Sequence, residues 1–552
     1  MSDAQRTEAK SHFEPISVKE TLTSVMIAFI MAFVFRGFVI EGFLIPTGSM
    51  APTLLGKHMR FLGPDTGYDF EVGPWDYADP RTGQIPLSIQ GANASAPIRP
   101  MDPMTHKEWD ATKVPLRAGD RVFVLKYLPV LFEPSRWDVV VFKNPGTEEN
   151  YIKRLVGLPS EQLAIVDGDI FTRPTSVITG DPRGAQAWAE DNWSIQRKPE
   201  RVQRAMFQLL FDSIYTPPSA GAVGSNYRAP WRGEGDWSGV NNSVSYRKNG
   251  SGAASLDWRT EDHPITDWAA YNVSRLGRNA EFPAPDVAMS FGIQPDPGAA
   301  PITITAVLDA TGFEFRAEYD AGAGRVTMKM RPQDAPDSDP WRTIVDDAQV
   351  PKLVADGAAT TVEFWHADQA LYFFIDGKLV AGGRERGAYE LTPAERMQAA
   401  TGHDLGDLLR RFPDPNDSIL GEPSTYQPTT LHWEFTGGPF TLHRVALKRD
   451  IYYQHHPSEP TRGANPMLPV VLNNTQYFMC GDNSPSSLDS RLWQPGAGRG
   501  APDPWIADQV DDTLGVVHKD LLIGKAFVVY FPAPLRETKV PIPDVGRMRW
   551  IW

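Results

Sequence analysis

The sequence predicts a mainly β protein with one N-terminal membrane helix, a β-rich catalytic domain and a large inserted all-β sandwich. Three observations lead to this prediction. One uncharged apolar run lies near the N-terminus, and β-branched runs occur both soon after it and near the C-terminus. Between these runs, short alternating strands are separated by Gly, Asp and Pro. With 552 residues, the chain is long enough for more than one domain.

The apolar run spans residues 21–35 and reads TLTSVMIAFIMAFVF; Arg36 interrupts it before GFVI. A cleaved signal peptide would begin with a basic region and end at a small-residue site, and this segment has neither. We therefore interpret residues 20–40 as an uncleaved transmembrane anchor, in which Arg36 reaches toward one interface. A buried core helix is the alternative. The basic residues before the span favour an N-terminus on the inner side of the membrane, after a short cytoplasmic segment at 1–19. These residues are Arg6, Lys10 and Lys19.

Composition excludes several classes of function. The formal net charge of −14 argues against nucleic acid as a general partner. The single cysteine, Cys480, allows no intrachain disulfide and no cysteine-based zinc site, and we interpret it as a small buried strand residue. The eleven histidines form no HExxH-type motif. The sequence thus predicts neither a metal nor a cofactor.

Turn and strand patterns divide the rest of the chain. Strands are expected over 117–127, 135–145 and 150–171, the last with a hairpin at Asp167 and Gly168. A helix is expected within 199–215. The predicted parts are a first catalytic part at 41–171 with an irregular excursion at 59–116, an insert at 172–465 with its sandwich at about 290–455, and a second catalytic part at 466–552.

The sandwich prediction rests on strand rhythm and on one hairpin. The stretch ALYFFIDGKLVAGG alternates in polarity and turns at Asp376 and Gly377. It resembles the corresponding hairpin of concanavalin-like, laminin-G-type sandwiches. Nothing in the pattern identifies a ligand for the insert.

Three separated segments carry chemistry when taken together: IPTGSMAPTL at 45–54, YIKRLVGLP at 151–159 and GDNSPSSLDSR at 481–491. Each alone is typical of a turn, an exposed strand or an Asx-turn. Their order, with GDRVFV and a terminal IGKAF strand, resembles bacterial type I signal peptidases. These are membrane-anchored serine proteases of peptidase family S26 that use a serine–lysine dyad. The large insert and LGPDTGYDFEVG resemble planctomycete-type sequences. The family match covers about residues 18–57, 117–171 and 470–532.

The resemblance implies roles for individual residues. Ser49 would be the nucleophile and Lys153 the general base. Thr47 and the Ser49 N–H would form the oxyanion hole, and Ser487 would orient the lysine. Asp489 and Arg491 would form a structural pair that supports the turn, together with Asp482. The partner of Asp482 is left open, because Ser484 and Pro485 stand where the family usually has Arg and Asp. The implied substrate pocket consists of Ile45, Leu54, Tyr151 and Ile152.

The chemistry requires these residue types. A serine hydroxyl is a poor nucleophile until a base takes its proton. Free lysine has a pKa of about 10.4 and is protonated at neutral pH. Apolar neighbours would lower that pKa by removing Lys153 from water. Such a dyad needs neither histidine nor metal.

The resemblance also implies a substrate and a location. Shallow pockets beside extended strands suit a peptide with small residues, which matches the Ala-x-Ala end of secretory signal peptides. The expected partners are preprotein signal peptides, the lipid bilayer and the secretion translocon. The expected location is the bacterial cytoplasmic membrane, with the catalytic domain on its outer face. Two alternatives stay open: an inactive, membrane-anchored binding protein that uses the sandwich, and a specialised peptidase for a single substrate.

Overall fold

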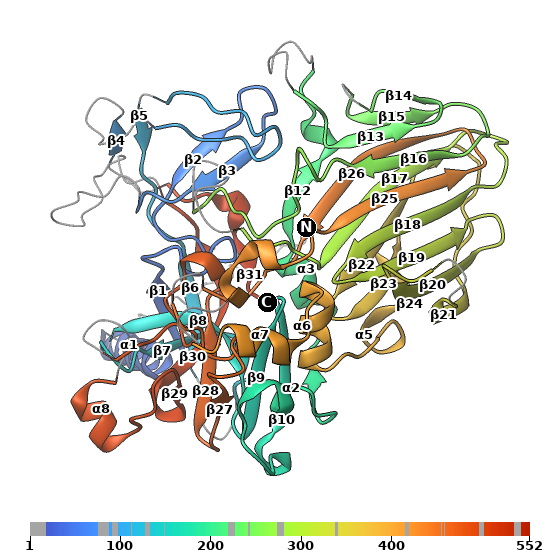
Figure 1. Cartoon of the computed structure of the whole chain (residues 1–552). Coiled ribbons are helices and arrows are strands. Elements are labelled where there is room, and N and C mark those ends of the chain that lie inside the picture. Colours follow the sequence, from blue (N-terminus) through green and yellow to red (C-terminus); the bar gives the residue numbers. More distant parts are fainter. Residues whose placement is uncertain are drawn as a thin grey trace, which may run out of the picture.

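The predicted fold class is confirmed: the protein is mainly β, with an N-terminal apolar helix and a large β-sandwich (Figure 1). The structure is a computed structural model. It describes residues 18–75, 88–90, 98–111, 113–126, 133–147, 149–218, 227–240, 243–272, 281–336, 340–414, 419–453, 455–456, 459–495, 502–534 and 542–552. Most of the predicted segment 1–19 lies outside these residues.

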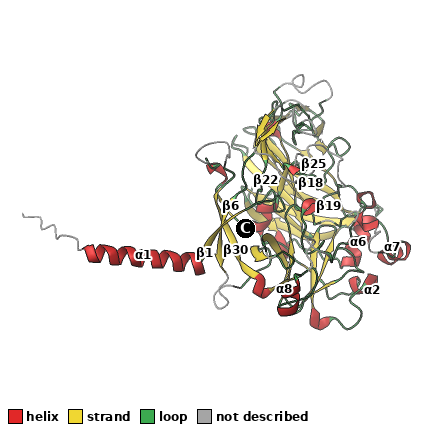
Figure 2. Ribbon diagram, turned by 90° about the vertical axis from the view of Figure 1, so that its left-hand side faces the viewer, coloured by secondary structure: helices red, strands yellow, loops and turns green. Residues whose placement is uncertain are grey.

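Helix α1 (Val18–Phe38) projects away from the body of the protein (Figure 2). Its 21 residues include none that is buried, so it is not a core helix. At a rise of about 1.5 Å per residue it is about 31 Å long, close to the thickness of a bilayer's hydrocarbon core. Among the described residues it is the one helix long and apolar enough to span a membrane. It ends two residues earlier than predicted because Ile40 already pairs with Leu125 in a sheet.

The part of the chain that the sequence predicts to be catalytic is built around an eight-stranded antiparallel sheet, named the catalytic sheet after that prediction, which combines strands from both ends of the chain. Its order is β1-β6-β30-β7-β8-β28-β29, with β31 paired to β30. The catalytic sheet therefore requires chain segments from both sides of the long insert. Its strands are β1 (Ile40–Leu44), β6 (Arg121–Lys126), β7 (Val139–Lys143), β8 (Asn150–Gly157), β28 (Gln476–Cys480), β29 (Val517–His518), β30 (Leu522–Phe531) and β31 (Arg549–Trp550).

A four-stranded sheet, ordered β11-β10-β9-β27, lies between the catalytic sheet and the sandwich in the chain path. The predicted hairpin is present between β9 and β10. Its turn residues Asp167 and Gly168 have φ angles of 50° and 86°, the left-handed conformation that a tight hairpin turn requires. The strands are β9 (Glu161–Val166), β10 (Asp169–Pro174), β11 (Ser194–Ile195) and β27 (Val470–Val471).

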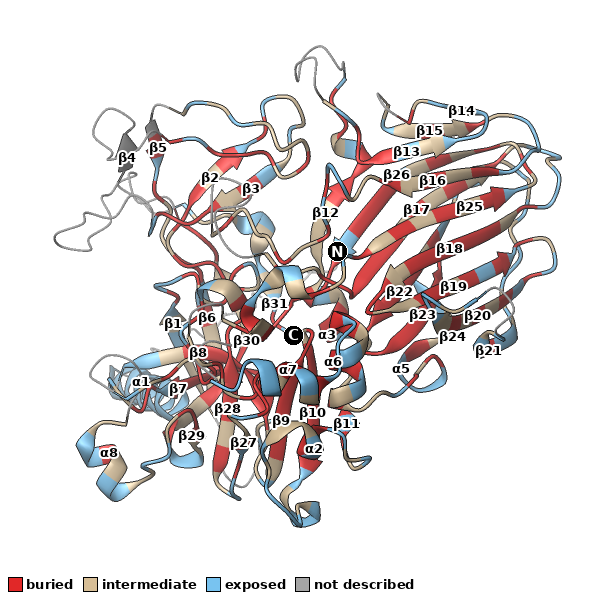
Figure 3. Ribbon diagram, in the orientation of Figure 1, coloured by how far each residue is buried: buried red, intermediate tan, exposed pale blue. Residues whose placement is uncertain are grey.

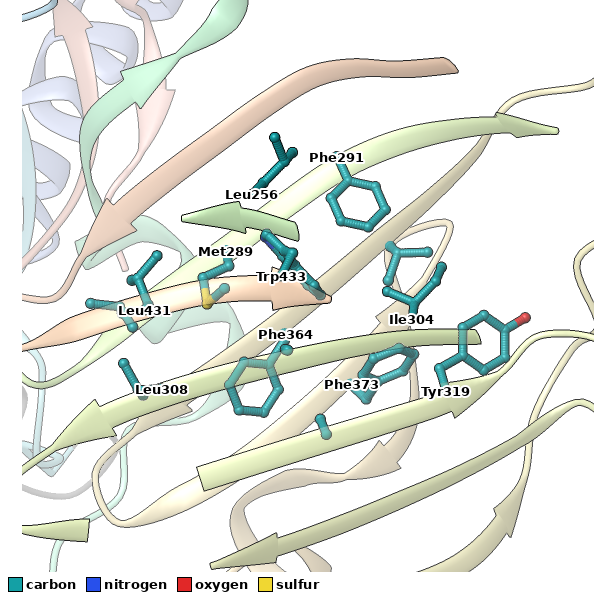
Figure 4. Close-up of a cluster of buried hydrophobic side chains, with 14 of the residues drawn as sticks. Leu256, Met289, Phe291, Ile304, Leu308, Tyr319, Phe364, Phe373, Leu431 and Trp433 are labelled. Carbon is teal, nitrogen blue, oxygen red and sulfur yellow. The ribbon is translucent and has the colours of Figure 1, made fainter. Parts of the chain in front are cut away.

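The insert folds into two packed antiparallel sheets (Figures 1 and 3). One has the order β14-β15-β26-β17-β22-β23-β24, with β12 on β26; the other has the order β13-β16-β25-β18-β19-β20-β21. Aromatic and aliphatic side chains of both sheets, including Phe291, Trp433, Leu308 and Phe364, meet between them (Figure 4). The predicted hairpin joins β23 to β24 at Asp376 and Gly377.

The strands of the first sheet are β12 (Gln208–Asp212), β14 (Trp237–Ser238), β15 (Ser245–Lys248), β17 (Val287–Pro295), β22 (Thr360–Ala367), β23 (Ala370–Ile375), β24 (Lys378–Gly382) and β26 (Phe440–Arg449). Those of the second are β13 (Trp231–Glu234), β16 (Ala254–Trp258), β18 (Thr303–Ala310), β19 (Phe313–Asp320), β20 (Arg325–Pro332), β21 (Arg342–Gln349) and β25 (Thr430–Thr436).

The sandwich begins earlier than the predicted boundary near residue 290. Strands β12 to β16 already belong to its two sheets. The helix expected over 199–215 is shorter, because α3 (Glu200–Met206) gives way to β12, which pairs with β26. The sequence of β12 has a helical pattern, but its backbone forms hydrogen bonds with β26, and this pairing determines the local structure.

Short helices accompany these sheets. They are α2 (Gly184–Trp188), α5 (Gly383–Arg386), α6 (Pro393–Thr401), α7 (Leu405–Arg411) and α8 (Pro504–Gln509). Helix α6 begins with a capping box between Thr392 and Glu395, a pattern readable in the sequence.

The excursion at 59–116 is not irregular throughout, contrary to the prediction. It contains the hairpin β2 (Met59–Leu62) and β3 (Asp69–Val72) and the pair β4 (Ser88–Gln90) and β5 (Lys113–Pro115). Phe61 and Phe70 are cross-strand partners in a small separate core. This core stabilises the excursion where Gly, Pro and Asp alone predict only loop.

Candidate active site

The loop that carries Ser49 follows β1 and is anchored by hydrogen bonds to Asp120. The Ile45 N–H donates to Asp120 O at 2.9 Å, and the Leu55 N–H donates to the Asp120 carboxylate at 3.0 Å. Between these anchors, Leu54 N donates to Met50 O at 2.8 Å and closes a tight turn. Ser49 therefore lies in a braced turn at the end of an anchored strand.

Lys153 lies on β8 and faces this turn. Its Nζ is 2.6 Å from Ser49 Oγ and 3.1 Å from Ile152 O. Only 3% of Lys153 is exposed to solvent. The structure thus brings the two predicted catalytic residues into hydrogen-bond contact across 104 residues of sequence.

Lys153 loses its proton more readily than a free lysine does. Burial lowers the pKa of Lys153 from 10.5 to about 8, although the carboxylates of Asp489 and Asp482 raise it in part. The Tyr151 ring lies 5.4 Å from Nζ, measured to its centroid. With such a pKa, about one tenth of the lysine is neutral at pH 7 and can accept a proton.

Asn483 holds the backbone of the Ser49 loop. Its Nδ2 donates to Gly48 O at 2.9 Å, and its backbone N–H donates to Ser49 O at 3.1 Å. Thr47 is exposed and lines the cleft beside Ser49, where an oxyanion donor is expected. The Ser49 N–H donates to no other described residue, so it is available to a ligand.

The expected pair of Asp489 and Arg491 is formed and fully buried. Arg491 Nη2 and Nε lie 2.8 and 2.9 Å from the two carboxylate oxygens. Burial raises the pKa of Asp489, but the Arg491 charge outweighs it and the net pKa falls below the usual value. Arg491 also donates to Ser484 Oγ at 2.7 Å, so the atypical serine at this position contributes to the turn.

The partner of Asp482, which the sequence left open, is Arg154. Arg154 Nε and Nη2 donate to the two carboxylate oxygens at 2.7 and 2.6 Å, and both side chains are fully buried. Arg154 also donates to Trp137 O and Trp552 O, at 2.7 and 2.9 Å. Sequence reasoning missed this arginine, although its place directly after Lys153 on one strand was a usable clue.

Ser487 does not contact the lysine as expected. Its Oγ is buried, and a hydrogen bond from Ser487 helps to lower the pKa of Asp489; Lys153 Nζ is directed to Ser49 Oγ and Ile152 O instead. Cys480 is buried on β28, and burial raises its thiol pKa well above the usual range. This agrees with its interpretation as a packing residue.

A cleft of about 470 Å³ opens at the dyad. Two of the four residues predicted for the substrate pocket, Tyr151 and Ile152, line it. The other two do not: Ile45 and Leu54 are 2% and 0% exposed and pack into the core beneath the loop. The turn closed by Leu54 N directs these side chains inward, which the sequence could not show. The lining residues that sequence reasoning missed are Trp75, Glu149, Asn150, Tyr271, Asn272, Asn483, Ser486 and Leu488.

One edge of β8 is open at the cleft. Strand β7 pairs with β8 from Asn150 to Arg154 on one side. On the other side β28 pairs only from Arg154 onward. Within the described residues, the backbone at 150–153 therefore has one unpaired edge, which can accept an extended peptide.

One buried acidic group could also hold a cation: the carboxylates of Asp169, Asp286 and Asp368 lie within 4.8 Å of one another. Lys198 and Arg396 already form ion pairs there, with Lys198 paired to Asp368 and Arg396 Nη2 3.3 Å from Asp169. These cations supply the counter-charge that a metal would bring.

Comparisons with known proteins agree with the predicted family. The family model described as "Signal peptidase, peptidase S26" matches residues 101–200 and 441–531. Signal peptidase I of Buchnera aphidicola subsp. Acyrthosiphon pisum is 26% identical over 191 residues, which are 34% of this chain and 44% of the relative. Signal peptidase I of Rickettsia typhi is 30% identical over 156 residues, 28% and 43% of the two chains. The resemblance to type I signal peptidases is thereby confirmed.

The extent of these matches is limited. The chain spans less than half the length of these two relatives, and the family match includes Lys153 but not Ser49. Among solved structures, a carbohydrate-binding module (CBM66) from Bacillus subtilis is 8% identical, with a TM-score of 0.23 over 40% of this chain and 95% of its own. A Bacillus subtilis protein of unknown function with a galectin-like fold is 9% identical, with a TM-score of 0.25 over 44% of this chain and 98% of its own. Likenesses at these scores say nothing about what the sandwich binds.

Proposed function

We propose that this protein is a membrane-anchored serine endopeptidase that removes signal peptides from exported preproteins. Ser49 is the nucleophile and neutral Lys153 the general base. The observation that carries this proposal is the 2.6 Å contact between Lys153 Nζ and Ser49 Oγ, made by a lysine that is 3% exposed. A complete dyad speaks against the alternative of an inactive binding protein on this scaffold.

The reaction follows from this geometry. Lys153 Nζ takes the proton of Ser49 Oγ as the oxygen attacks the scissile carbonyl. The Ser49 N–H and the Thr47 hydroxyl receive the developing negative charge, which arises only in the transition state. The Lys153 ammonium then gives its proton to the leaving amine, and an acyl group remains on Ser49. Water activated by Lys153 hydrolyses that ester and regenerates the dyad.

The cleft also suggests how substrate binds. An extended peptide pairs with the open edge of β8 at 150–153, so backbone hydrogen bonds provide affinity for many sequences. Tyr151 and Ile152 lie at that edge and line the cleft, where we expect small side chains in an Ala-x-Ala pattern to bind. Helix α1 holds this cleft near the membrane surface, where signal peptides emerge. The proposed location is the outer face of the bacterial cytoplasmic membrane, close to the translocon, with the N-terminus inside.

The test uses the full chain in detergent and a preprotein with alanines before the cleavage site. Ser49→Ala and Lys153→Ala should each abolish cleavage, while Lys143→Ala and Ser194→Ala, matched changes at exposed strand positions, should not. N-terminal sequencing of the product locates the cut. Normal cleavage by folded Lys153→Ala would overturn the dyad, and a wild-type protein that leaves the preprotein intact would overturn the activity.

A further inference from the structure

The insert reaches the dyad through two adjacent residues, Tyr271 and Asn272, which both line the cleft. Asn272 and Asn483 form a reciprocal amide pair. Asn272 Nδ2 donates to Asn483 Oδ1 at 2.6 Å, and Asn483 Nδ2 donates to Asn272 Oδ1 at 2.7 Å. The two residues are 211 positions apart, one in the insert and one in the catalytic part. The insert is therefore hydrogen-bonded to the residue that holds the Ser49 loop.

The orientation of the Asn483 amide is determined by its other partner. Gly48 O, a carbonyl, can only accept a hydrogen bond, so Asn483 must present its Nδ2 to it. The Asn483 Oδ1 is then left facing the insert, where Asn272 Nδ2 satisfies it. Since Asn483 is 5% exposed, this oxygen would otherwise lack a partner in a poorly hydrated place.

The Gly48 carbonyl in turn decides where the Ser49 N–H points. The two groups belong to one planar trans peptide unit, so they point in opposite directions. Holding Gly48 O toward Asn483 turns the Ser49 N–H away from Asn483, and this N–H is free of described partners. A flipped peptide would break the bond to Asn483 and would present a carbonyl where an oxyanion donor is needed.

Tyr271 packs against the same peptide unit. A Cβ atom built on Gly48 would lie 2.1 Å from Tyr271 Cε1, so only glycine fits here. The Tyr271 hydroxyl also donates to Lys57 O at 3.0 Å, near the end of the loop. Two independent contacts thus fasten the insert to the Ser49 loop.

The geometry points to Asn272 as a positioning residue that the insert supplies to the active site: acting through Asn483, it holds the Gly48–Ser49 peptide in the orientation that forms the oxyanion hole. This inference rests on the proposed function. It makes the insert a working part of the catalytic unit and gives the nucleophile loop a support from outside the catalytic sheet.

The expected effect is on kcat. Loss of an oxyanion donor costs about 10²–10³ in rate, and Asn272→Ala loosens that donor without removing it. For Asn272→Ala we therefore expect kcat to fall about tenfold or more, which is less than the loss of a whole donor, and KM to change less than about threefold. The apparent pKa of the pH–rate profile should stay that of wild type, because within the described structure Asn272 is hydrogen-bonded to Asn483 and Lys153 to Ser49 and Ile152. General unfolding of the site would change both KM and the apparent pKa.

The experiment compares full-length wild type with Asn272→Ala, Asn483→Ala and the double variant on one preprotein. If Asn272 acts through Asn483, the double variant should be no slower than Asn483→Ala alone. Asn192→Ala is the matched control, because the side chain of this insert asparagine bonds to Arg173 and Glu190 among the described residues and does not line the cleft. Thermal unfolding shows whether each variant is folded at the assay temperature. Should Asn272→Ala be unfolded, Asn272→Ser keeps a hydroxyl partner and should give an intermediate kcat.

The outcomes separate this inference from the proposed function. Wild-type kcat in folded Asn272→Ala or Asn272→Ser, or losses that multiply in the double variant, would overturn the role of Asn272 while leaving the peptidase activity established. Absence of cleavage by wild type would overturn both.

Discussion

Raising the pH from 6 to 9 should greatly increase kcat/KM of the wild-type enzyme. Only neutral Lys153 can accept the serine proton, and burial lowers its pKa to about 8. The neutral fraction is then about 1% at pH 6, about 9% at pH 7 and about 90% at pH 9, by the ordinary titration of one group. The rate should therefore rise about tenfold per pH unit at first and level off above pH 8.

The assay is initial-rate cleavage of a short fluorogenic peptide, well below KM, in detergent at constant ionic strength. Because kcat/KM reports the free enzyme, its midpoint is the pKa of Lys153 before substrate arrives. A substrate that excludes water from the cleft should lower the midpoint seen in kcat still further. A profile that stays flat between pH 6 and 8 would remove Lys153 as the base. A midpoint near that of free lysine would show that burial does not activate it.

Three further results are expected. Lys153→Met should raise the free energy of unfolding at pH 7 by up to about 3 kcal/mol, because it removes a buried ammonium group. This gain in stability should shrink as the pH rises from 8 toward 10.5, since Lys153 of the unfolded wild type then also loses its proton. Denaturant unfolding at several pH values measures it, and a gain independent of pH would contradict it. Asp482→Asn should lower stability by about 3–5 kcal/mol by leaving the buried Arg154 guanidinium without its carboxylate; an unchanged melting temperature would refute the pairing. Gly48→Ala should abolish cleavage, since its methyl group overlaps Tyr271; near-normal activity would show that the insert does not pack there in solution.

The residues predicted well from sequence are those in short, ordered motifs. Segments of about ten residues are enough to predict Ser49 and Lys153, and the structure brings the two side chains together. The hairpin at Asp376 and Gly377 was also readable, because a tight turn has local requirements. The prediction that Ile45 and Leu54 line the pocket is wrong, because both side chains pack into the core. A sequence motif does not show which side of a turn faces the cleft.

The contacts that sequence reasoning missed join distant parts of the chain. Arg154 and Asp482 are 328 residues apart, and Asn272 and Asn483 are 211 apart. No periodicity or spacing relates such partners, and each side chain taken alone reads as an ordinary polar residue. In the excursion at 59–116, the abundance of Gly, Pro and Asp obscured a small core around Phe61 and Phe70.

The topology explains why the insert meets the active site. Strand β9 follows β8 directly, β27 precedes β28 by a few residues, and β8 pairs with β28. The insert therefore leaves and rejoins the catalytic sheet beside the two strands that carry Lys153 and the Cys480–Asn483 turn. A domain placed at this point of the fold begins and ends on the chain path that joins β8 to β28, and in this protein it extends back to the cleft through Tyr271 and Asn272. Addition of a domain there can thus supply a residue such as Asn272 to the catalytic site without rearranging the catalytic sheet.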